Sequence, residues 1–577
     1  MGRLYSRRSI VRGGIAAGGS MVFAAGCSGN GPPRTPATAA REPAETPEPV
    51  TATATAATIA APSAAAPARG GKATVMAPRA FTFDTLDAQQ SGDLSTIEVL
   101  GRTHSRLVAW RSFEEPILAG DLASSWEIPA PDVLVLRMNP AARWQQREPL
   151  NGRAVTAEDV AAHLRRTLAL AGGGKLPQAQ RGHEFANVRR VTAAGDSVRI
   201  ETDGPAPFLL HTLAGRFAFV QPPEAVAAFA ATWQEARPRE VVGSGPFLYN
   251  GRTPAGGLLF AANAGGHARP ILDELAVAAP FDPVGAYQRG DAHQVIARDR
   301  RDAANLLALG ATPGVRLEEQ PVLAAMYVGA PPWNDARLTA ALSIALNRPA
   351  LAAALFGGRA RTSGTVAPVF GQFALTSLEL SNFPGFRAEL QEDIATARSL
   401  WAAGGGPALG PVTVDFPSIF DPAYSASTTT VARLNSTLGG AQFRPAVETY
   451  TTIARKAVEH RYGSGSAAFW FGWGPTFFEP DPSRFLIETF HSGGPGSATT
   501  GFSSPEVDAL LDRLAGEFDM ARRRSAVTEV ARLLQSGSGG LLNLLVQEAG
   551  VFSVPGLVRA PLSPFPDQHR DAQTSRA

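Results

Sequence analysis

The chain contains one cysteine, Cys27, and the position of this residue limits which part of the sequence can fold. Two adjacent arginines, Arg7 and Arg8, precede a glycine- and alanine-rich apolar run that ends immediately before Cys27. A twin-arginine pair before such a run is typical of an export signal, which is removed and does not contribute to the fold. Because a single thiol cannot form an internal disulfide, we expect the folded body to be stabilised by its hydrophobic core.

The residues around Cys27 also indicate how the mature chain begins. Small residues precede this cysteine at the place where a lipoprotein signal peptidase cleaves. We therefore expect the mature chain to begin at a lipidated Cys27 and to be anchored on the outer face of the cytoplasmic membrane, since two or more acyl chains bind a membrane stably. Ala24 departs from this pattern, because lipoprotein signals usually have leucine there. Cleavage near Ala25 to a soluble exported protein is one alternative, and a buried N-terminal helix is another.

The charge of the chain argues against a nucleic-acid partner. The formal net charge is +2, and four positive charges lie in the signal, which has no acidic residue: Arg3, Arg7, Arg8 and Arg12. Removal of the signal therefore changes the formal charge from +2 to −2. Nucleic-acid binding would require clustered cationic stripes, which the sequence does not show. No apolar run of membrane-spanning length follows the signal, so we expect no second membrane span.

Residues 28–69 consist mainly of proline, alanine and threonine and have few large apolar side chains. Such a segment cannot bury enough surface to offset its ordering entropy, so we expect a disordered linker. A polyproline-like chain of this length would hold a domain on the order of 100 Å from the membrane, at roughly 3.1 Å per residue. The remaining body, from about residue 70 to 577, is long enough for about three domains or lobes.

Short β-type runs alternate with helical patterns in the body, which predicts an α/β protein. Runs such as residues 133–136, 198–200 and 258–260 predict strands. Thr156 with Asp159 resembles a capping box at the start of a helix that the glycines from 172 onward would end. Ser504-Pro505 predicts an N-cap and a first-turn proline for a later helix. The apolar stripes of both helices are expected to face the core.

Catalytic motifs are missing from the sequence. Gly243-Ser244-Gly245 and Gly463-Ser464-Gly465 lack the spacing of a nucleophile elbow. His183-Glu184 is not followed by the second histidine of a zinc helix. The nine histidines form no H-x-H or H-x3-H pair. We therefore predict no enzymatic activity, no catalytic residue, no metal site and no cofactor.

Several motifs occur along the body in a defined order. The front motifs are Leu86-Asp87, residues 121–127 (DLASSWE), residues 133–137, Trp144 and residues 149–160 (PLNGRAVTAEDV). The later motifs are residues 243–247 (GSGPF), a helical segment 335–348, Gly472-Trp473 followed by Glu479-Pro480 and Asp481-Pro482, and a helical tail 504–535. In this order, over residues 71–560, the chain resembles the extracellular solute-binding proteins that serve peptide and nickel ABC importers.

The resemblance implies a two-lobed α/β fold of the periplasmic-binding-protein type (type II), with an extra small domain in the front half. We place lobe I at residues 71–104, 226–325 and 541–577, the inserted small domain at 105–225, and lobe II at 326–540. The implied function is capture of a small organic or peptide-like solute between two closing lobes, followed by delivery to the permease and ATPase subunits of an importer. We expect a monomer without turnover. A protein that binds nickel or haem complexes is the first alternative, and a secreted enzyme is the second.

The resemblance also bears on the solute. In peptide-binding members, an aspartate after the Gly-Trp pair receives the α-ammonium of the peptide, and Thr476 stands at that place here. A hydroxyl cannot neutralise a buried ammonium, and an unpaired buried charge costs several kcal/mol. Pro475 also removes one backbone N–H that could pair with an extended peptide. We therefore predict a neutral or N-blocked solute; if the register is shifted, Glu479 or Asp481 would act instead.

The ligand contacts that the resemblance implies lie in both lobes: Trp473, Gly474, Thr476, Ser91 and Gly92. The aromatic run 469–471 beside Trp473 could belong to the core or to the pocket. His491 alone is weak support for metal-complex capture. Gln89-Gln90 with Trp473 would permit a sugar ligand without indicating one.

Overall fold

The computed structural model describes residues 69–78, 80–112, 116–172, 179, 181–279, 282–418, 425–462, 467–474, 479–558 and 574–576. Several predicted features lie outside these residues: the export signal with Arg7 and Arg8, the expected lipidation site Cys27, nearly all of the linker and the predicted ligand contact Thr476.

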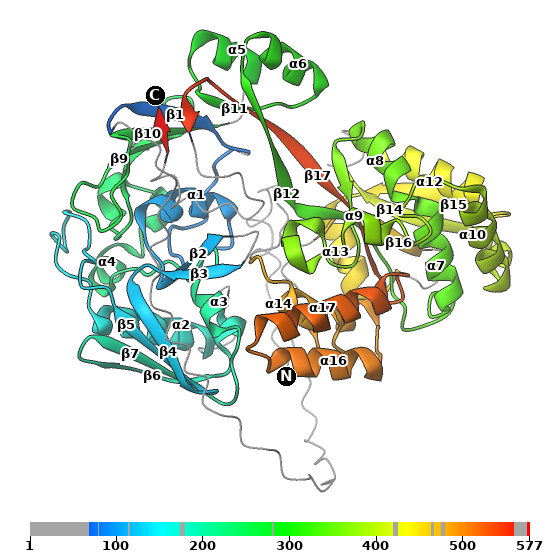
Figure 1. The fold of residues 1–577 in the computed structure, drawn as a ribbon, viewed down its shortest axis with the longest axis horizontal. Helices are drawn as coiled ribbons and strands as arrows, with labels where there is room; N and C mark the ends of the chain where they lie inside the picture. The colour runs from blue at the N-terminus through cyan, green and yellow to red at the C-terminus, as the bar shows by residue number, and fades with distance from the viewer. Residues whose placement is uncertain are drawn as a thin grey trace, which may run out of the picture.

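One mixed sheet of eleven strands connects the part of the body that contains β1 with the part that contains β14 and β16 (Figure 1). Its order is β15 (Gln442–Glu448), β14 (Pro411–Pro417), β16 (Ala467–Trp473), β12 (Thr312–Ala325), β17 (Leu541–Ser553), β11 (Gln294–Ile296), β1 (Lys72–Met76), β10 (Glu274–Ala278), β9 (Leu258–Ala262) and β8 (Phe247–Arg252), with β13 (Ala360–Thr362) also paired to β17. The sheet thus links early, middle and late segments of the chain.

The long strands β12 and β17 form the central connection of this sheet. The two strands are antiparallel, with Thr312 opposite Ser553 at one end and Ala325 opposite Leu541 at the other. At the first end β17 also pairs with β11, and at the second end β12 also pairs with β16. Figure 1 shows both strands running from the part of the molecule that contains β1 to the part that contains β14 and β16.

A separate antiparallel sheet forms the front domain, in the order β4 (Ala123–Ala130), β5 (Val133–Met138), β7 (Ser197–Thr202) and β6 (Val188–Ala194). Helix α2 (Ala157–Gly172) packs against β6 and β7. The predicted capping box is confirmed, because Asp159 N donates to Thr156 Oγ1 at 3.2 Å and Thr156 N donates to Asp159 Oδ2 at 2.9 Å. The helix extends to Gly172, and the glycines predicted to end it, at 173 and 174, lie outside the described residues.

Shorter elements complete the front half. They are α1 (Leu94–Thr103), the hairpin of β2 (Val108–Ser112) and β3 (Ile117–Gly120), η1 (Gly182–Phe185), α3 (Leu209–Leu213), α4 (Pro223–Phe229), η2 (Trp233–Glu235), η3 (Pro238–Glu240), α5 (Pro283–Arg289) and α6 (Arg300–Ala308). The glycines at 243 and 245 allow the chain to pass close to the end of α1, because a Cβ at Gly243 would lie 2.1 Å from Thr103 O. This close approach precedes β8 and explains the predicted tight entry into that strand.

The C-terminal half is mainly helical outside the sheet. Its elements are α7 (Ala336–Leu346), α8 (Arg348–Phe356), η4 (Pro368–Phe373), α9 (Ser377–Leu380), α10 (Gln391–Ala403), η5 (Gly406–Leu409), α12 (Ala426–Thr437), α13 (Tyr450–Val458), α14 (Ser483–Phe490), α15 (Pro495–Thr500), α16 (Pro505–Ala515) and α17 (Met520–Leu534), and a two-stranded sheet of β18 (Leu557–Val558) and β19 (Ser575–Arg576). Ser504 caps α16 as predicted. The segment 335–348 is not one helix, because Asn347 takes a φ of 37° and its side chain caps α8.

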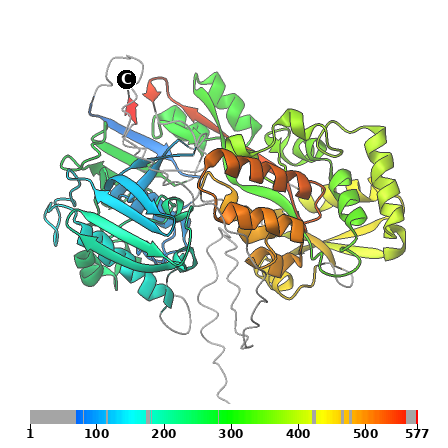
Figure 2. The same ribbon diagram turned by 60° about the horizontal axis from the view of Figure 1, so that its bottom comes forward.

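The hydrophobic cores show how these parts are joined. One core lies between the C-terminal part of the sheet and α7, α10 and α12, and another lies around α1 and the strands β1, β8, β9 and β10. A third core extends from the front domain to α14, α16 and α17. In both views these late helices lie beside the front domain (Figures 1 and 2).

Among the described residues no single helix is long and apolar enough to cross a membrane. The bent pair α7 and α8 reaches the required length and hydropathy only when its two helices are taken together.

Candidate functional site

Three parallel strands end at the same edge of the C-terminal part of the sheet. β14 lies between β15 and β16 and is parallel to both, so their carboxyl ends at Pro417, Glu448 and Trp473 share one edge. The chain leaves β14 towards β15 and then returns to the other side of β14 as β16. Ligands of open α/β sheets bind outside the carboxyl ends of the strands where the strand order reverses in this way. Trp473 and Gly474, two of the predicted ligand contacts, lie at this edge.

The structure gives Gly474 a packing role at this edge. Gly474 N donates to Pro321 O at 2.7 Å, and a Cβ at this residue would lie 2.5 Å from a methyl carbon of Leu323. The close approach to β12 therefore requires glycine. Trp473 is half-buried opposite Val322. In the preceding aromatic run, Phe469 and Phe471 are fully buried and belong to the core.

The predicted contacts of lobe I lie in the loop before α1. Ser91 Oγ donates to Asp84 Oδ1 at 2.7 Å, and Gly92 N donates to Asp84 Oδ2 at 3.1 Å. These bonds brace the loop. Ala88 and Gln89 of the same loop line a recess, whereas Ser91 and Gly92 do not. Gln89 is the residue of this loop whose side chain reaches the recess, and the role of Ser91 and Gly92 as ligand contacts stays a prediction.

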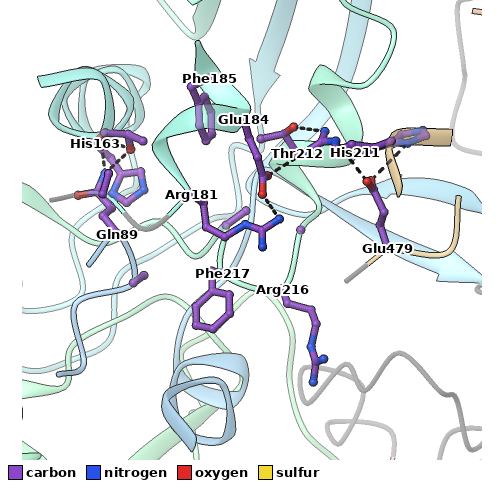
Figure 3. Close-up of a pocket in the computed structure, with 16 residues that line it drawn as sticks. Gln89, His163, Arg181, Glu184, Phe185, His211, Thr212, Arg216, Phe217 and Glu479 are labelled. Carbon is purple, nitrogen blue, oxygen red and sulfur yellow. Dashed lines mark hydrogen bonds and ion pairs between the residues drawn. The ribbon is translucent and has the colours of Figure 1, made fainter. Parts of the chain in front are cut away.

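The recess is assembled from three segments that are far apart in the sequence (Figure 3). It contains about 610 Å³ of empty space, including space open to solvent. Its lining consists of Ala88 and Gln89 from the loop before α1, of His163, Thr167, Ala179, Arg181, Glu184, Phe185, His211, Thr212, Gly215, Arg216, Phe217 and Ala218 from the front domain, and of Glu479 and Arg484 from the C-terminal half. The segment after the Gly-Trp pair thus reaches this recess through Glu479.

Ion pairs occupy one side of the recess. Glu184 contacts Arg181, and Arg484 Nη1 lies 2.9 Å from Glu184 Oε2. Arg484 Nε lies 3.3 Å from Glu479 Oε1, and Glu479 Oε2 lies 3.6 Å from His211 Nδ1. Figure 3 shows these contacts as dashed lines and shows Arg216 extending away from them. Charged groups of both signs therefore face the same small space.

A second buried pair lies behind the first. Asp481 contacts Arg523, and both side chains are almost fully buried. Arg523 Nη2 lies 3.2 Å from His211 Nε2. Because a guanidinium only donates, Nε2 of His211 accepts and Nδ1 carries the proton. That N–H faces Glu479 and Asp481, whose nearest oxygens lie 3.6 and 3.9 Å away.

Burial sets the protonation of these groups. Burial lowers the pKa of His211 to about 3 and the pKa of His163 to about 4, so both rings are neutral at pH 7. Burial raises the pKa of Glu479, although Arg484 opposes this shift. Burial also disfavours ionised Asp481, but His211 and Arg523 outweigh this effect and the pKa of Asp481 is lowered. The recess is thus an environment with strongly perturbed titratable groups, which is common at functional sites.

Gln89 connects the recess to the front domain. Gln89 Nε2 donates to His163 O at 2.7 Å and also contacts Thr167, both on α2. Arg166 of the same helix contacts Gln89 and forms an ion pair with Asp87. The loop before α1 is therefore held against α2, and the amide of Gln89 has a fixed position at the recess.

Sequence reasoning missed most of this charged group. Arg181, Glu184, His211, Arg484 and Arg523 were not predicted as site residues, because their partners are up to several hundred positions away and no short motif joins them. The one available signal was the pair of acidic residues Glu479 and Asp481 after the Gly-Trp pair. Within the part of the chain that the structure describes, no three histidine, cysteine, aspartate or glutamate side chains are grouped as metal ligands.

Comparisons with known proteins agree with the predicted fold. A family model of bacterial extracellular solute-binding proteins, family 5 (middle region), matches residues 118–497. Proteins of Brucella ovis and Brucella abortus that are provisionally named ABC transporter peptide-binding proteins are 29% identical over 268 residues, which cover 43% of this chain and 46% of theirs. The chain thus matches about half the length of these relatives.

Solved structures match over a larger part of the chain. The unliganded open form of the periplasmic murein tripeptide-binding protein MppA has a TM-score of 0.71 at 16% identity, covering 88% of this chain and 98% of MppA. NikA from Brucella suis in complex with Fe(III)-EDTA has a TM-score of 0.70 at 14% identity, covering 88% and 100%. DppA from Helicobacter pylori in complex with the peptide STSA has a TM-score of 0.66 at 15% identity, covering 88% and 98%. The predicted α/β fold of the periplasmic-binding-protein type is confirmed.

Proposed function

The chain belongs to the bacterial extracellular solute-binding proteins of family 5, and from that premise we propose that it captures a small organic or peptide-like solute for an ABC importer. The permease and ATPase subunits of the importer would be its partners. The observation that carries this proposal is the recess, whose lining comes from the loop before α1, from the front domain and from the segment after the Gly-Trp pair. A solute in the recess would therefore contact both halves of the molecule, which the backbone joins only at β12 and β17, away from the recess.

Capture of this kind needs contacts that depend on the arrangement of the parts. A ligand favours one conformation only through interactions that it makes in that conformation. The recess supplies such interactions, because Gln89, Arg181 and Glu479 come from three different segments. No bond of the solute has to be broken, so the proposed protein returns its solute unchanged.

The lobe layout predicted from the sequence remains our proposal for the moving parts. The predicted boundaries at 325/326 and 540/541 coincide with the end of β12 at Ala325 and the start of β17 at Leu541. These two strands are the connection between the part with β1 and the part with β16. This coincidence supports a hinge formed by β12 and β17.

Export and anchoring are the second part of the proposal. Arg7 and Arg8 would direct export, and acylated Cys27 would hold a monomer on the outer face of the cytoplasmic membrane. Cell fractionation of the Cys27→Ser variant tests the anchor. If Cys27 carries the anchor, the variant is released from the membrane pellet. Retention like that of the parent would contradict the anchor. Unchanged export after replacement of Arg7 and Arg8 by lysine would contradict the twin-arginine signal.

The solute is proposed to lack a free α-ammonium. Thr476 stands where peptide-binding relatives of this group are expected to have an aspartate, and the two nearby carboxylates already have cationic neighbours. Asp481 contacts Arg523, and Glu479 lies 3.3 Å from Arg484. An additional ammonium would therefore have to compete with an arginine for either carboxylate. A neutral or N-blocked solute avoids this competition.

A thermal-shift screen of the mature protein tests the proposed function. The probes are free di- to pentapeptides, their N-acetylated counterparts, sugars, opines and metal chelates. A true solute raises the stability by RT ln(1 + [L]/Kd), which is about 2.7 kcal/mol at a hundredfold excess over Kd. The proposal predicts a hit among the N-acetylated or neutral compounds, recovered with unchanged mass. A hit among metal chelates alone would favour the metal-complex alternative, and chemical conversion of more than one equivalent would indicate an enzyme.

A further inference from the structure

The charged side chains at the recess form pairs within each half of the molecule. The front domain contributes one pair and the C-terminal half contributes two: Arg181 with Glu184, Glu479 with Arg484, and Asp481 with Arg523. The Arg484 and Arg523 side chains are 14% and 3% exposed, so these pairs are largely removed from water. Each of these charges thus has an opposite charge on its own side.

A second set of contacts joins the two halves, and we call this set the junction. Arg484 provides most of it, with Nη1 2.9 Å from Glu184 Oε2 and Nη2 donating to Phe208 O at 3.2 Å. The same Nη2 donates to Thr212 Oγ1 at 2.5 Å. One arginine from the start of α14 therefore contacts both η1 and α3 of the front domain.

His211 provides a second part of the junction. Its ring lies between Arg523 at 3.2 Å and Glu479 at 3.6 Å, both from the C-terminal half. The guanidinium of Arg523 also lies over the ring of Phe208, 5.2 Å from its centroid. Phe208 and His211 pack edge to face, with ring centroids 5.8 Å apart. Short helix α3 is thus held between two buried arginines.

This arrangement has an unusual energetic consequence. Breaking a buried ion pair by removing one partner is strongly destabilising, because the other charge stays buried without compensation. Separation of the two halves here would break the junction but leave Arg181 with Glu184, Glu479 with Arg484 and Asp481 with Arg523. The junction groups that lose contact on the front side, besides Glu184, are the neutral His211 ring, the Phe208 ring, a hydroxyl and a backbone carbonyl. None of these groups is charged, so separation of the junction leaves no buried charge without a partner.

We infer that the junction is a separable latch between the front domain and the C-terminal half, built from charges that are neutralised on their own side before the halves meet. The inference rests on the proposed function in one respect. The latch residues Arg181, Glu184, His211, Thr212, Glu479 and Arg484 also line the recess. A solute in the recess therefore contacts the latch directly and shifts the arrangement of the halves through it.

Distance measurements between two spin labels test the latch without any solute. In a Cys27→Ser background, labels at Ala194→Cys and Ala515→Cys report on the front domain and on α16, since both positions are exposed. The test variant is His211→Ala with Thr212→Val, which removes junction contacts but leaves all three ion pairs. The matched control is Thr202→Val, because Thr202 Oγ1 bonds only within the front domain, to Asp132 O and Gly204 O.

The latch predicts that the double variant shifts the label distances towards longer values and lowers the ratio of the parent-distance population to the longer-distance population about fivefold, which is what the loss of one or two hydrogen bonds gives. The control should keep the parent distribution. An unchanged distribution in a folded double variant would overturn the inference. If the double variant does not fold, Thr212→Val alone tests the same contact of Arg484 with a near-isosteric change, and an unchanged distribution there would also overturn it.

The outcomes separate the latch from the proposed function. Longer distances in the variant together with no hit in the thermal-shift screen would support the latch and contradict solute capture. A solute hit together with unchanged distances in the variant would support solute capture and contradict the latch.

Discussion

Two of the connections between the halves of this molecule differ in chemistry, and a hydrophobic core from the front domain to α14, α16 and α17 joins the halves as well. The first is the antiparallel pair β12 and β17, in which Val322, Leu323, Leu544 and Leu545 are fully buried. The second is the junction, where Arg484 and Arg523 of the C-terminal half hold α3 of the front domain. The strands bury apolar surface and pair their backbones, whereas the junction pairs charges and hydroxyls. The strand pair is part of the fold itself, whereas the junction is proposed to form in only one arrangement of the two halves.

With the junction as the proposed latch, this difference would let one chain combine a permanent and a reversible contact. Each buried aliphatic side chain of the strands contributes about 1.5–3 kcal/mol, and this contribution is lost entirely if the strands separate. Each junction contact exchanges a hydrogen bond within the protein for one with water, so the net contribution is about 0.5–1.5 kcal/mol. The strand pair can therefore act as a hinge that stays intact while the junction opens.

The largest expected effect comes from a charge in the strand connection. Leu545→Asp places a carboxylate in a fully buried position of β17, and we expect loss of the folded state, because a buried unpaired charge costs several kcal/mol. Gln547→Asp, a partly exposed position of the same strand, is the control and should remain folded. Thermal unfolding followed by circular dichroism measures both. A cooperative transition of Leu545→Asp close to that of the parent would contradict the claim that apolar burial stabilises the strand pair.

A smaller effect is expected where an own-side pair of the junction is broken. Arg523→Met leaves Asp481 buried without its arginine, and we expect a destabilisation of about 3–5 kcal/mol. The neighbouring Arg524→Met is the matched control, since Arg524 lies on the exposed side of α17. Urea unfolding compares the two variants, and Asp481→Asn in the Arg523→Met background should restore part of the loss. Equal stability of Arg523→Met and Arg524→Met would show that the pair is not needed to neutralise Asp481.

The pH dependence of stability should follow the buried histidines of the front half. Burial lowers the pKa of His104 and of His211 to about 3 and the pKa of His163 to about 4, from an ordinary value of 6.5. The unfolded chain therefore binds protons below pH 6.5 that the folded chain does not bind, so stability is retained above pH 6.5 and falls as the pH decreases towards 4. Each histidine accounts for up to about 2 kcal/mol at pH 5.

Melting temperatures between pH 7.5 and 5 check this dependence. His163→Asn removes one of the three groups and should make the decrease less steep. The raised pKa of Glu479 acts in the opposite direction at lower pH, because a folded state that binds its proton more readily gains stability on acidification. A melting temperature that does not fall between pH 6.5 and 5 would contradict the buried, neutral histidines.

The smallest expected effect concerns the solute. Thr476→Asp supplies the carboxylate that an α-ammonium requires, and we expect about tenfold tighter binding of free-amine peptides, or about 1.4 kcal/mol. Thr396→Asp, at an exposed position of α10, adds the same charge elsewhere and serves as the control. Calorimetry with free and N-acetylated peptides measures the difference. Micromolar binding of free peptides by the parent, unaffected by Thr476→Asp, would contradict the proposed role of this position.

Local signals explain what could be predicted from the sequence. The caps at Thr156 and Ser504 lie within three residues of the backbone groups that they bind, so the starts of α2 and α16 could be predicted from the sequence. The fold class followed from motifs in a fixed order. The division of α7 and α8 at Asn347 was missed, because the apolar pattern continues through a residue whose positive φ breaks the helix. The predicted contacts Ser91 and Gly92 stay predictions, and the structure adds Gln89 of the same loop as a residue that lines the recess.

The junction could not be predicted, for a physical reason. Glu184 and Arg484 are 300 positions apart, and His211 and Arg523 are 312 positions apart. Charged residues at such separations look like solvated surface in a sequence, because only the packing of α3 against α14 and α17 buries them together. Glu479 and Asp481 were noticed as possible ammonium acceptors, but their arginine partners emerge only from the fold.

Small-angle scattering of the mature protein with and without a saturating solute from the thermal-shift screen tests whether the solute brings the two halves together. We expect a smaller radius of gyration in the bound state, reached at one equivalent of solute, because the solute favours the arrangement in which the recess and the junction are formed. An unchanged radius of gyration at saturation, with one equivalent bound, would contradict a solute-binding protein that works by moving its two halves.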